Sequence, residues 1–174
     1  PETDESGAIR PFNDYGRTKA EAEVVFREWQ QRAPQSRALT IVRPTVIFGE
    51  RNRGNVYNLL NQIARGRFLM VGDGRNCKSM AYVENVAAFL EFCLASEAGV
   101  RVVNYIDKPD MTMNELVGLF YASLHRKPGL VRRLPYALGY LIGAAFDVLA
   151  MITGRKFPVS RIRVRKFCAT TQFA

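Results

Sequence analysis

The sequence predicts an α/β fold, because segments with helical and strand-like patterns alternate along its 174 residues. Residues 15–31 carry apolar side chains at helical spacing, with Ala22, Phe26 and Trp29 on one stripe, so we expect an amphipathic helix. Residues 39–43 form a short apolar, β-branched run that ends at a proline, as a buried strand does. A helix, a strand and a glycine-containing loop in this order make one step of an α/β fold.

The segments that follow continue this alternation. We expect a helix over residues 54–66, short strands over 68–71 and 78–81 around a Gly-Asp-Gly turn, a helix over 82–94 and a strand over 102–106. Thr112 and Glu115 fit a capping box, so another helix begins there. Residues 161–165 alternate between arginine and apolar residues, which is compatible with an edge strand, whereas Ser160 as a cap favours a short helix.

Composition indicates a single compact, globular unit, with 48% hydrophobic and 24% charged residues. Cys77, Cys93 and Cys168 form no C-x-x-C pair and no metal-ligand spacing with His125. We therefore expect neither a metal site nor a disulfide framework. Reduced thiols are typical of a cytoplasmic protein.

The net charge of +9 indicates an anionic partner. Nucleic acid, an anionic lipid surface and a phosphate-bearing ligand would all be attracted. The basic residues are not interleaved with aromatic residues as in a base-stacking surface, and no nucleic-acid motif is present. We therefore expect no nucleic-acid partner.

Tyr15 and Lys19 combine a phenol with an ammonium group near the start of the first helix, which Asn13 or Asp14 can cap. Residues four apart share one face of a helix. A cation beside a phenol favours the phenolate, which is the form that can accept a proton. The pair is therefore a candidate for proton transfer, although a tyrosine and a lysine at this spacing can also simply begin a helix.

Four short motifs occur in a fixed order: Tyr-Gly-Arg-Thr-Lys at 15–19, Arg-Pro-Thr-Val-Ile-Phe-Gly at 43–49, Gly-Asp-Gly at 72–74 and Met-Ala-Tyr-Val-Glu-Asn-Val-Ala at 80–87. Together they resemble the extended short-chain dehydrogenase/reductase superfamily. The branch that they resemble contains the NAD-dependent epimerase/dehydratases that act on nucleotide sugars, such as UDP-glucose 4-epimerase.

The resemblance implies the C-terminal part of a Rossmann-type parallel sheet plus a smaller mixed α/β substrate-binding lobe. Residues 1–53 would be the C-terminal part of the dinucleotide-binding domain, with the catalytic helix and the strand after it. Residues 54–174 would be mainly the substrate-binding lobe, with a returning Rossmann segment near 82–106.

The family's Gly-rich dinucleotide turn is not found, and Ser6 is too close to Tyr15 to be the family's catalytic Ser or Thr. We therefore expect the C-terminal portion of a longer enzyme, inactive by itself and taking part in polysaccharide biosynthesis.

The resemblance also assigns roles to individual residues. Tyr15 would exchange a proton with a sugar hydroxyl, and Lys19 would support the phenolate and bind the nicotinamide ribose. Pro44 and Thr45 would line the nicotinamide pocket. The cofactor would be NAD, with NADP left open, and the reaction would oxidise and re-reduce the sugar through a keto intermediate.

The substrate-binding residues implied by the resemblance are Val46, Asn55, Lys78, Arg161 and Arg163. The substrate would be a nucleotide sugar, and the full-length protein would form a homodimer. Three positions depart from the nucleotide-sugar pattern, namely Val46, Lys78-Ser79 and Asn85, where the family often has Asn, Arg-Asp and Asp. Two alternatives therefore stay open: a hydroxysteroid or lipid alcohol dehydrogenase, and a non-catalytic nucleotide- or membrane-binding module.

Residues 134–153 are long and apolar enough to cross a membrane, with Asp147 as the only charge. A charge within a span is costly, and Pro135 is placed as the start of a helix in a globular protein. We favour a packed lobe helix, with an interfacial helix and then a membrane span as the alternatives. The expected localisation is cytoplasmic, with peripheral membrane contact through 134–153 if this helix is interfacial.

Overall fold

The computed structural model describes residues 3–11, 13–125, 132–155 and 157–174. The chain divides into two compact units, so the single unit expected from composition is not observed. Unit 1 comprises Pro1–Arg51, Ser79–Lys108 and Gln172–Ala174, and unit 2 comprises Asn52–Lys78 and Pro109–Thr171. Both units contain helices and strands, and the paired strands include parallel pairs, so the predicted α/β class is confirmed.

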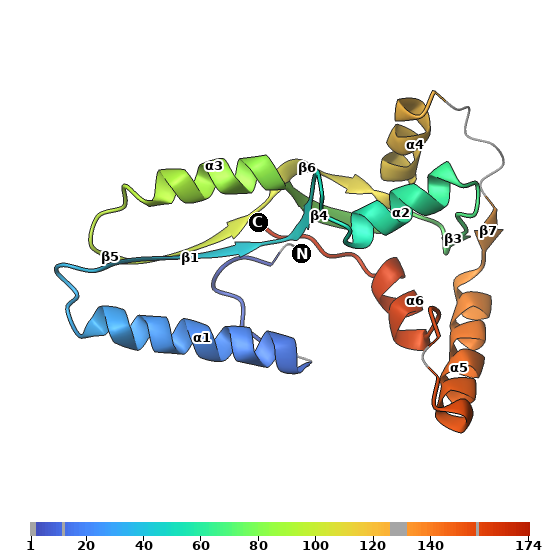
Figure 1. Cartoon of the computed structure of the whole chain (residues 1–174), viewed down its shortest axis with the longest axis horizontal. Helices are drawn as coiled ribbons and strands as arrows, with labels where there is room; N and C mark the ends of the chain where they lie inside the picture. Colours follow the sequence, from blue (N-terminus) through green and yellow to red (C-terminus); the bar gives the residue numbers. More distant parts are fainter. Residues whose placement is uncertain (1–2, 12, 126–131, 156) are drawn as a thin grey trace. The chain divides into compact units, whose positions relative to one another are not determined.

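Unit 1 is built on a parallel pair of strands. β1 (Ala38–Pro44) and β5 (Gly99–Tyr105) pair over their full length, from Ala38 opposite Gly99 to Pro44 opposite Tyr105. α1 (Asp14–Gln31) and α3 (Val83–Cys93) lie on opposite sides of this pair (Figure 1). Helices on both faces of parallel strands make the layered arrangement of a doubly wound fold.

A second sheet has the strand order β2-β4-β6. β2 (Val46–Phe48) pairs in parallel with the last residues of β4 (Cys77–Tyr82). β6 (Asp107–Thr112) was not expected from the sequence, because its Lys-Pro-Asp centre lacks the apolar alternation of a strand. The chain passes from one unit to the other within β4 and again within β6.

The first helix begins one residue earlier than expected, at Asp14. Asn13 caps it, and its side-chain oxygen accepts a hydrogen bond from the Gly16 amide at 2.8 Å. The predicted apolar stripe does not mark the buried face, because the side chains of Phe26 and Trp29 are 56% and 42% exposed. The buried residue of this helix is Gln30, whose amide donates to two backbone carbonyls of the following loop.

Unit 2 contains four helices and two short strands among the residues that the structure describes, apart from its part of β4 and β6. They are α2 (Asn55–Ala64), β3 (Met70–Val71), α4 (Met113–Ser123), β7 (Arg133–Leu134), α5 (Tyr136–Thr153) and α6 (Arg161–Cys168). The strands predicted on either side of the Gly-Asp-Gly turn do form, but they do not pair with each other. β3 pairs with β7, which was not predicted.

Local sequence signals set the helix ends of unit 2. Both hydrogen bonds of the predicted capping box between Thr112 and Glu115 are present. Ser160 caps α6 by accepting from the Arg163 amide, so the helical alternative for residues 161–165 is confirmed. The buried side chains include Ile63 of α2 and Leu116 of α4, which form part of the core of this unit.

α5 packs on α6 with one side and is less buried than we expected for a packed lobe helix. Only Gly139 and Gly143 are buried among its 18 residues, and most of its large apolar side chains are exposed, whereas the Phe146 ring lies 5.4 Å from that of Phe157. Pro135 is the N-cap of this helix rather than its first residue. Hydropathy alone could not distinguish a helix covered by its own chain from one that leaves an apolar face open.

Candidate active site

Tyr15 and Lys19 lie on one face of the first turns of α1. The Lys19 ammonium is 5.6 Å from the centre of the Tyr15 ring. Both side chains are exposed, Tyr15 by 72%. The Asn13 cap fixes the helix start just before this pair, and the 3.6-residue turn brings the two side chains together. The phenol and the cation are therefore adjacent and open to a ligand.

A cavity of about 320 Å³ lies beside this pair, within unit 1. Its lining includes Gly16 and Lys19 of α1 and, at the carboxyl end of β1, Pro44 and Thr45. The Thr45 amide donates to the Tyr105 carbonyl at the end of β5. The carboxyl ends of parallel strands are where doubly wound folds bind their ligands.

Thr45, which lines this cavity, has an unpaired hydroxyl. Its side-chain oxygen is buried and is the only buried side-chain nitrogen or oxygen with no hydrogen-bond partner among the described residues. A buried hydroxyl without a partner costs free energy, so such a group indicates a position where a ligand can supply the partner.

An ion pair missed by the sequence analysis also lines the cavity. The Glu23 carboxylate accepts from Arg43 Nε at 2.8 Å and from Arg43 Nη2 at 2.6 Å. This bidentate hydrogen bonding lowers the pKa of Glu23 against the effect of its burial. Because the two residues are 20 positions apart, no local spacing signals the contact. The pair holds α1 against β1 next to Lys19.

The predicted substrate-binding residues fall in both units. Val46 is in β2 of unit 1 and is 38% exposed, whereas Asn55 is the first residue of α2 in unit 2. Lys78 is half-buried, and its ammonium donates to the backbone carbonyls of Lys166, at 2.9 Å, and of Ala169. Burial lowers the pKa of Lys78. These contacts tie the C-terminal end of α6 to β4.

The two predicted arginines of α6 also contact protein groups. Arg161 Nε and its backbone amide both donate to the Asp147 carboxylate, at 2.9 and 3.2 Å. Arg163 donates to the Pro158 carbonyl at 2.9 Å. Both side chains remain exposed. The structure thus brings Tyr15, Lys19, Pro44 and Thr45 together in one unit and gives Lys78, Arg161 and Arg163 partners within the other.

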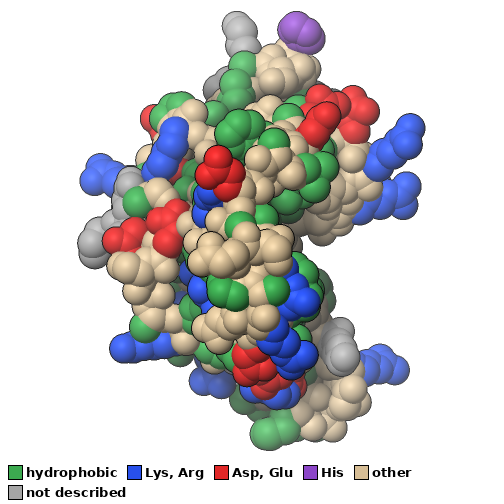
Figure 2. Space-filling view, turned by 90° about the vertical axis from the view of Figure 1, so that its left-hand side faces the viewer, with side chains coloured by type: hydrophobic (Ala, Val, Ile, Leu, Met, Phe, Trp, Pro, Cys, Tyr) green, Lys and Arg blue, Asp and Glu red, His purple; other side chains and the backbone are tan. Residues whose placement is uncertain are grey.

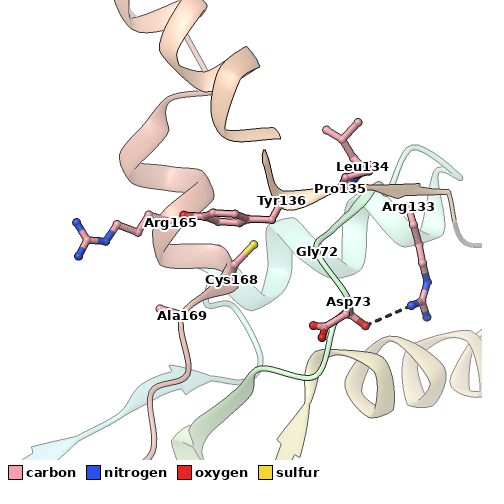
Figure 3. A pocket seen from close by; sticks show the side chains of 9 residues that line it. All are labelled: Gly72, Asp73, Arg133, Leu134, Pro135, Tyr136, Arg165, Cys168 and Ala169. Carbon is pink, nitrogen blue, oxygen red and sulfur yellow. Dashed lines mark hydrogen bonds between the residues drawn. The ribbon is translucent and has the colours of Figure 1, made fainter. Parts of the chain in front are cut away.

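A larger cavity, of about 770 Å³, lies in unit 2 where α5 begins (Figure 3). Tyr136 and Cys168 both line it, and Arg133 donates to the Asp73 carbonyl at 3.3 Å. None of the predicted site residues lines it. The smaller cavity, by contrast, is lined by the predicted residues Lys19, Pro44 and Thr45.

The described residues contain no cluster of His, Cys, Asp and Glu that could hold a metal ion. The three cysteines are free thiols. His125, the single histidine, is exposed at the surface (purple in Figure 2).

Comparison with known proteins identifies a family and close relatives. The model of the "NAD dependent epimerase/dehydratase family" matches residues 1–105. An N-acetyl-alpha-D-glucosaminyl-diphospho-ditrans,octacis-undecaprenol 4-epimerase of Escherichia coli O157:H7 is 58% identical over 172 residues, which is 98% of this chain and 51% of that protein. A UDP-glucose 4-epimerase of Vibrio cholerae is 26% identical over 83% of this chain and 44% of its own length.

Among solved structures, UDP-glucuronic acid 4-epimerase from Bacillus cereus in complex with NAD is similar, with a TM-score of 0.65 and 17% identity over 78% of this chain and 45% of that chain. At this identity the likeness shows the fold. The chain spans about half the length of the curated relatives that it matches.

Proposed function

We propose, from the premise that this chain belongs to the NAD dependent epimerase/dehydratase family, that it is the C-terminal part of an NAD-dependent sugar epimerase. The observation that carries the proposal is the arrangement of Tyr15 and Lys19 beside the cavity that Pro44 and Thr45 line. A protein that only binds ligands has no need of a phenol next to a cation. The proposal applies to the full-length protein.

In the proposed reaction, Tyr15 in its phenolate form takes the proton of a sugar hydroxyl, and the carbinol carbon becomes a ketone. After the ketone turns over in the site and is reduced on its other face, Tyr15 returns the proton to the new alkoxide. Lys19, whose ammonium lies 5.6 Å from the centre of the ring, stabilises the phenolate before the first proton transfer and after the second. The protons balance within one turnover.

The cavity residues fit NAD. Bound NAD would accept the hydride from the carbinol carbon and give it back, so no net oxidation occurs. Pro44 and Thr45 would contact the nicotinamide end, and Lys19 would donate to its ribose. The buried hydroxyl of Thr45 needs a hydrogen-bond partner, which supports a polar ligand at this point.

For the substrate, we propose a sugar joined through a diphosphate to its carrier. The carrier that we favour is a polyprenol, because the relative from Escherichia coli O157:H7 is named for a diphospho-undecaprenol substrate. A nucleoside carrier is the second candidate, since the Vibrio cholerae relative is a UDP-glucose 4-epimerase. Of the five predicted substrate-binding residues, Val46, Asn55, Arg161 and Arg163 remain in the proposal, and Lys78 is set aside because its ammonium binds two backbone carbonyls. Lys78 would have to exchange its carbonyl partners to bind a phosphate.

A polyprenol-linked substrate suits a cytoplasmic enzyme attached to a membrane and taking part in polysaccharide biosynthesis. We therefore keep peripheral membrane contact through residues 134–153 in the proposal. We also propose a homodimer for the full-length protein. Exposed apolar side chains on α1, such as Val25 at 62% and Phe26 at 56%, support a protein partner on that helix.

The test is an assay of the full-length protein with NAD and two substrates that carry the same sugar. One is N-acetylglucosaminyl-diphospho-polyprenol in vesicles, and the other is UDP-N-acetylglucosamine. We expect conversion of the lipid-linked sugar to its 4-epimer without accumulation of NADH. Conversion of the UDP sugar alone would show that the carrier is a nucleoside and not a polyprenol. The epimerase proposal would be overturned by NADH accumulation with a sterol or lipid alcohol, or by NAD binding without any turnover.

A further inference from the structure

α5 presents a continuous apolar face to solvent. The helix has a mean hydropathy of 1.6, yet only 11% of its residues are buried. Leu141 is 64% exposed and Ile152 is 74% exposed. Residues three and four apart lie on one side of a helix. The residues on this side, all uncharged and apolar, are Leu138, Leu141, Ala145, Val148 and Ile152.

The opposite face of α5 is fixed on α6, which lies beside it within unit 2 (Figure 1). A side-chain carbon added to Gly143 would lie 2.8 Å from the Arg161 amide nitrogen, so the two backbones approach as closely as a glycine allows. Asp147 accepts two hydrogen bonds from Arg161 on this side. The single acidic residue of α5 is therefore neutralised against α6 and lies away from the apolar face.

We propose that the outward face of α5 docks on an anionic lipid bilayer, with the helix lying in the plane of the interface. Arg132 precedes the helix and Arg155 follows it, and both are exposed. In an anionic bilayer, the apolar face would contact the lipid acyl chains, and the basic residues at both ends would contact the negatively charged headgroups. The inference deepens the proposed function, on which it rests for its lipid-linked substrate.

The contact with α6 argues for an interfacial helix rather than a membrane span. α6 is packed along α5 and carries exposed Arg161, Arg163 and Arg165. If α5 crossed the membrane, it would carry these arginines into the hydrocarbon core, where a charged side chain costs free energy. A helix in the interface keeps α6 on its aqueous side and buries only the apolar face.

The flanking charges also argue for a bilayer over a second copy of the chain. If two α5 helices packed face to face in antiparallel orientation, Arg132 of one copy would lie toward Arg155 of the other. In parallel orientation each arginine would approach its own counterpart. Like charges opposed across an interface destabilise it, whereas an anionic surface satisfies both helix ends.

The experiment is sedimentation of the full-length protein with vesicles of phosphatidylcholine, with and without phosphatidylglycerol, in the absence of substrate. We expect binding that increases with phosphatidylglycerol and decreases with salt. Leu141→Glu should weaken binding to the mixed vesicles about tenfold or more, because it replaces an inserted leucine by a carboxylate. Its melting temperature should not change, because Leu141 is exposed.

The matched control is Leu119→Glu, the same change at a leucine that is 49% exposed on α4. It should leave vesicle binding unchanged. Failure of the parent protein to bind any vesicle, or equal binding by the Leu141→Glu variant, would overturn the proposal. So would a Leu141→Glu variant that changes from dimer to monomer without any change in vesicle binding. This experiment measures vesicle binding and not turnover. A failure of the epimerase proposal would therefore be seen only in the assay with the two sugar substrates.

Discussion

The two units use their charged side chains in different ways. In unit 1, Tyr15 and Lys19 are exposed beside a cavity, with the ammonium group next to the phenol ring. In unit 2, Lys78 is bound to backbone carbonyls at the end of α6, and Arg161 is bound to Asp147. The proposed catalytic pair of unit 1 is thus open to a ligand, whereas Lys78 and Arg161 already have protein partners.

This difference predicts opposite outcomes of mutation. Changes at the open pair of unit 1 should affect turnover and leave stability unchanged. Changes at the protein-bound cations and close helix contacts of unit 2 should affect stability first.

The largest effect is expected for Tyr15→Phe in the full-length protein. Loss of the proton-transferring hydroxyl should lower kcat by about 10²–10⁴-fold. The melting temperature should not change, because the side chain is 72% exposed. Tyr57→Phe is the control, since it makes the same change at a tyrosine that is 44% exposed on α2 and outside the cavity. A Tyr15→Phe enzyme with normal kcat would remove the phenol from the mechanism.

Gly143→Ala should give the next largest effect, on stability. The added carbon would lie 2.8 Å from backbone atoms of Ser160 and Arg161, so α5 and α6 must separate. Overpacking of this kind costs about 1–3 kcal/mol. In Gly118→Ala the new carbon meets nothing within 4 Å, so this change in α4 should stabilise by about 0.5–1 kcal/mol. Urea midpoints measure both, and equal midpoints for the two variants would contradict the close contact.

These contrasts show what the sequence could determine. Helix caps were predictable, because Asn13 and the Thr112–Glu115 box bond groups only three residues away. The pairing of Tyr15 with Lys19 was predictable for the same reason. The partner of Lys78 was not, because the carbonyl that it binds lies 88 positions further along the chain. The open face of α5 was not predictable either, since an apolar pattern does not specify what covers it.

Lys78→Met tests whether this cation is a structural or a ligand-binding group. Two hydrogen bonds from the half-buried ammonium to the end of α6 would be lost, so we expect a destabilisation of about 1–2 kcal/mol with little change in KM. Lys78→Arg should recover part of the stability, because it restores donors. A rise in KM for the diphosphate-linked sugar with an unchanged urea midpoint would instead show that Lys78 binds the substrate.

The smallest effect is expected for the ion pair beside the cavity, tested by Glu23→Gln. Arg43 lowers the pKa of Glu23 in the folded state, so the pair contributes fully above the unfolded value near pH 4.3. Its contribution is lost as the pH falls below that value and through the lower folded pKa. The side chains are only 24% and 19% exposed, so the variant should be less stable by about 1 kcal/mol at pH 7.

The difference between the parent protein and Glu23→Gln should therefore shrink as urea midpoints are measured at decreasing pH below about 4.3. Glu21→Gln provides the control on the same helix, because its ion pair with Arg17 is 59% and 56% exposed. It should change stability at pH 7 by about 0.5 kcal/mol or less. If Glu23→Gln instead loses the same stability at all pH values, Arg43 holds α1 through hydrogen-bond geometry alone. The charge of the carboxylate would then contribute nothing.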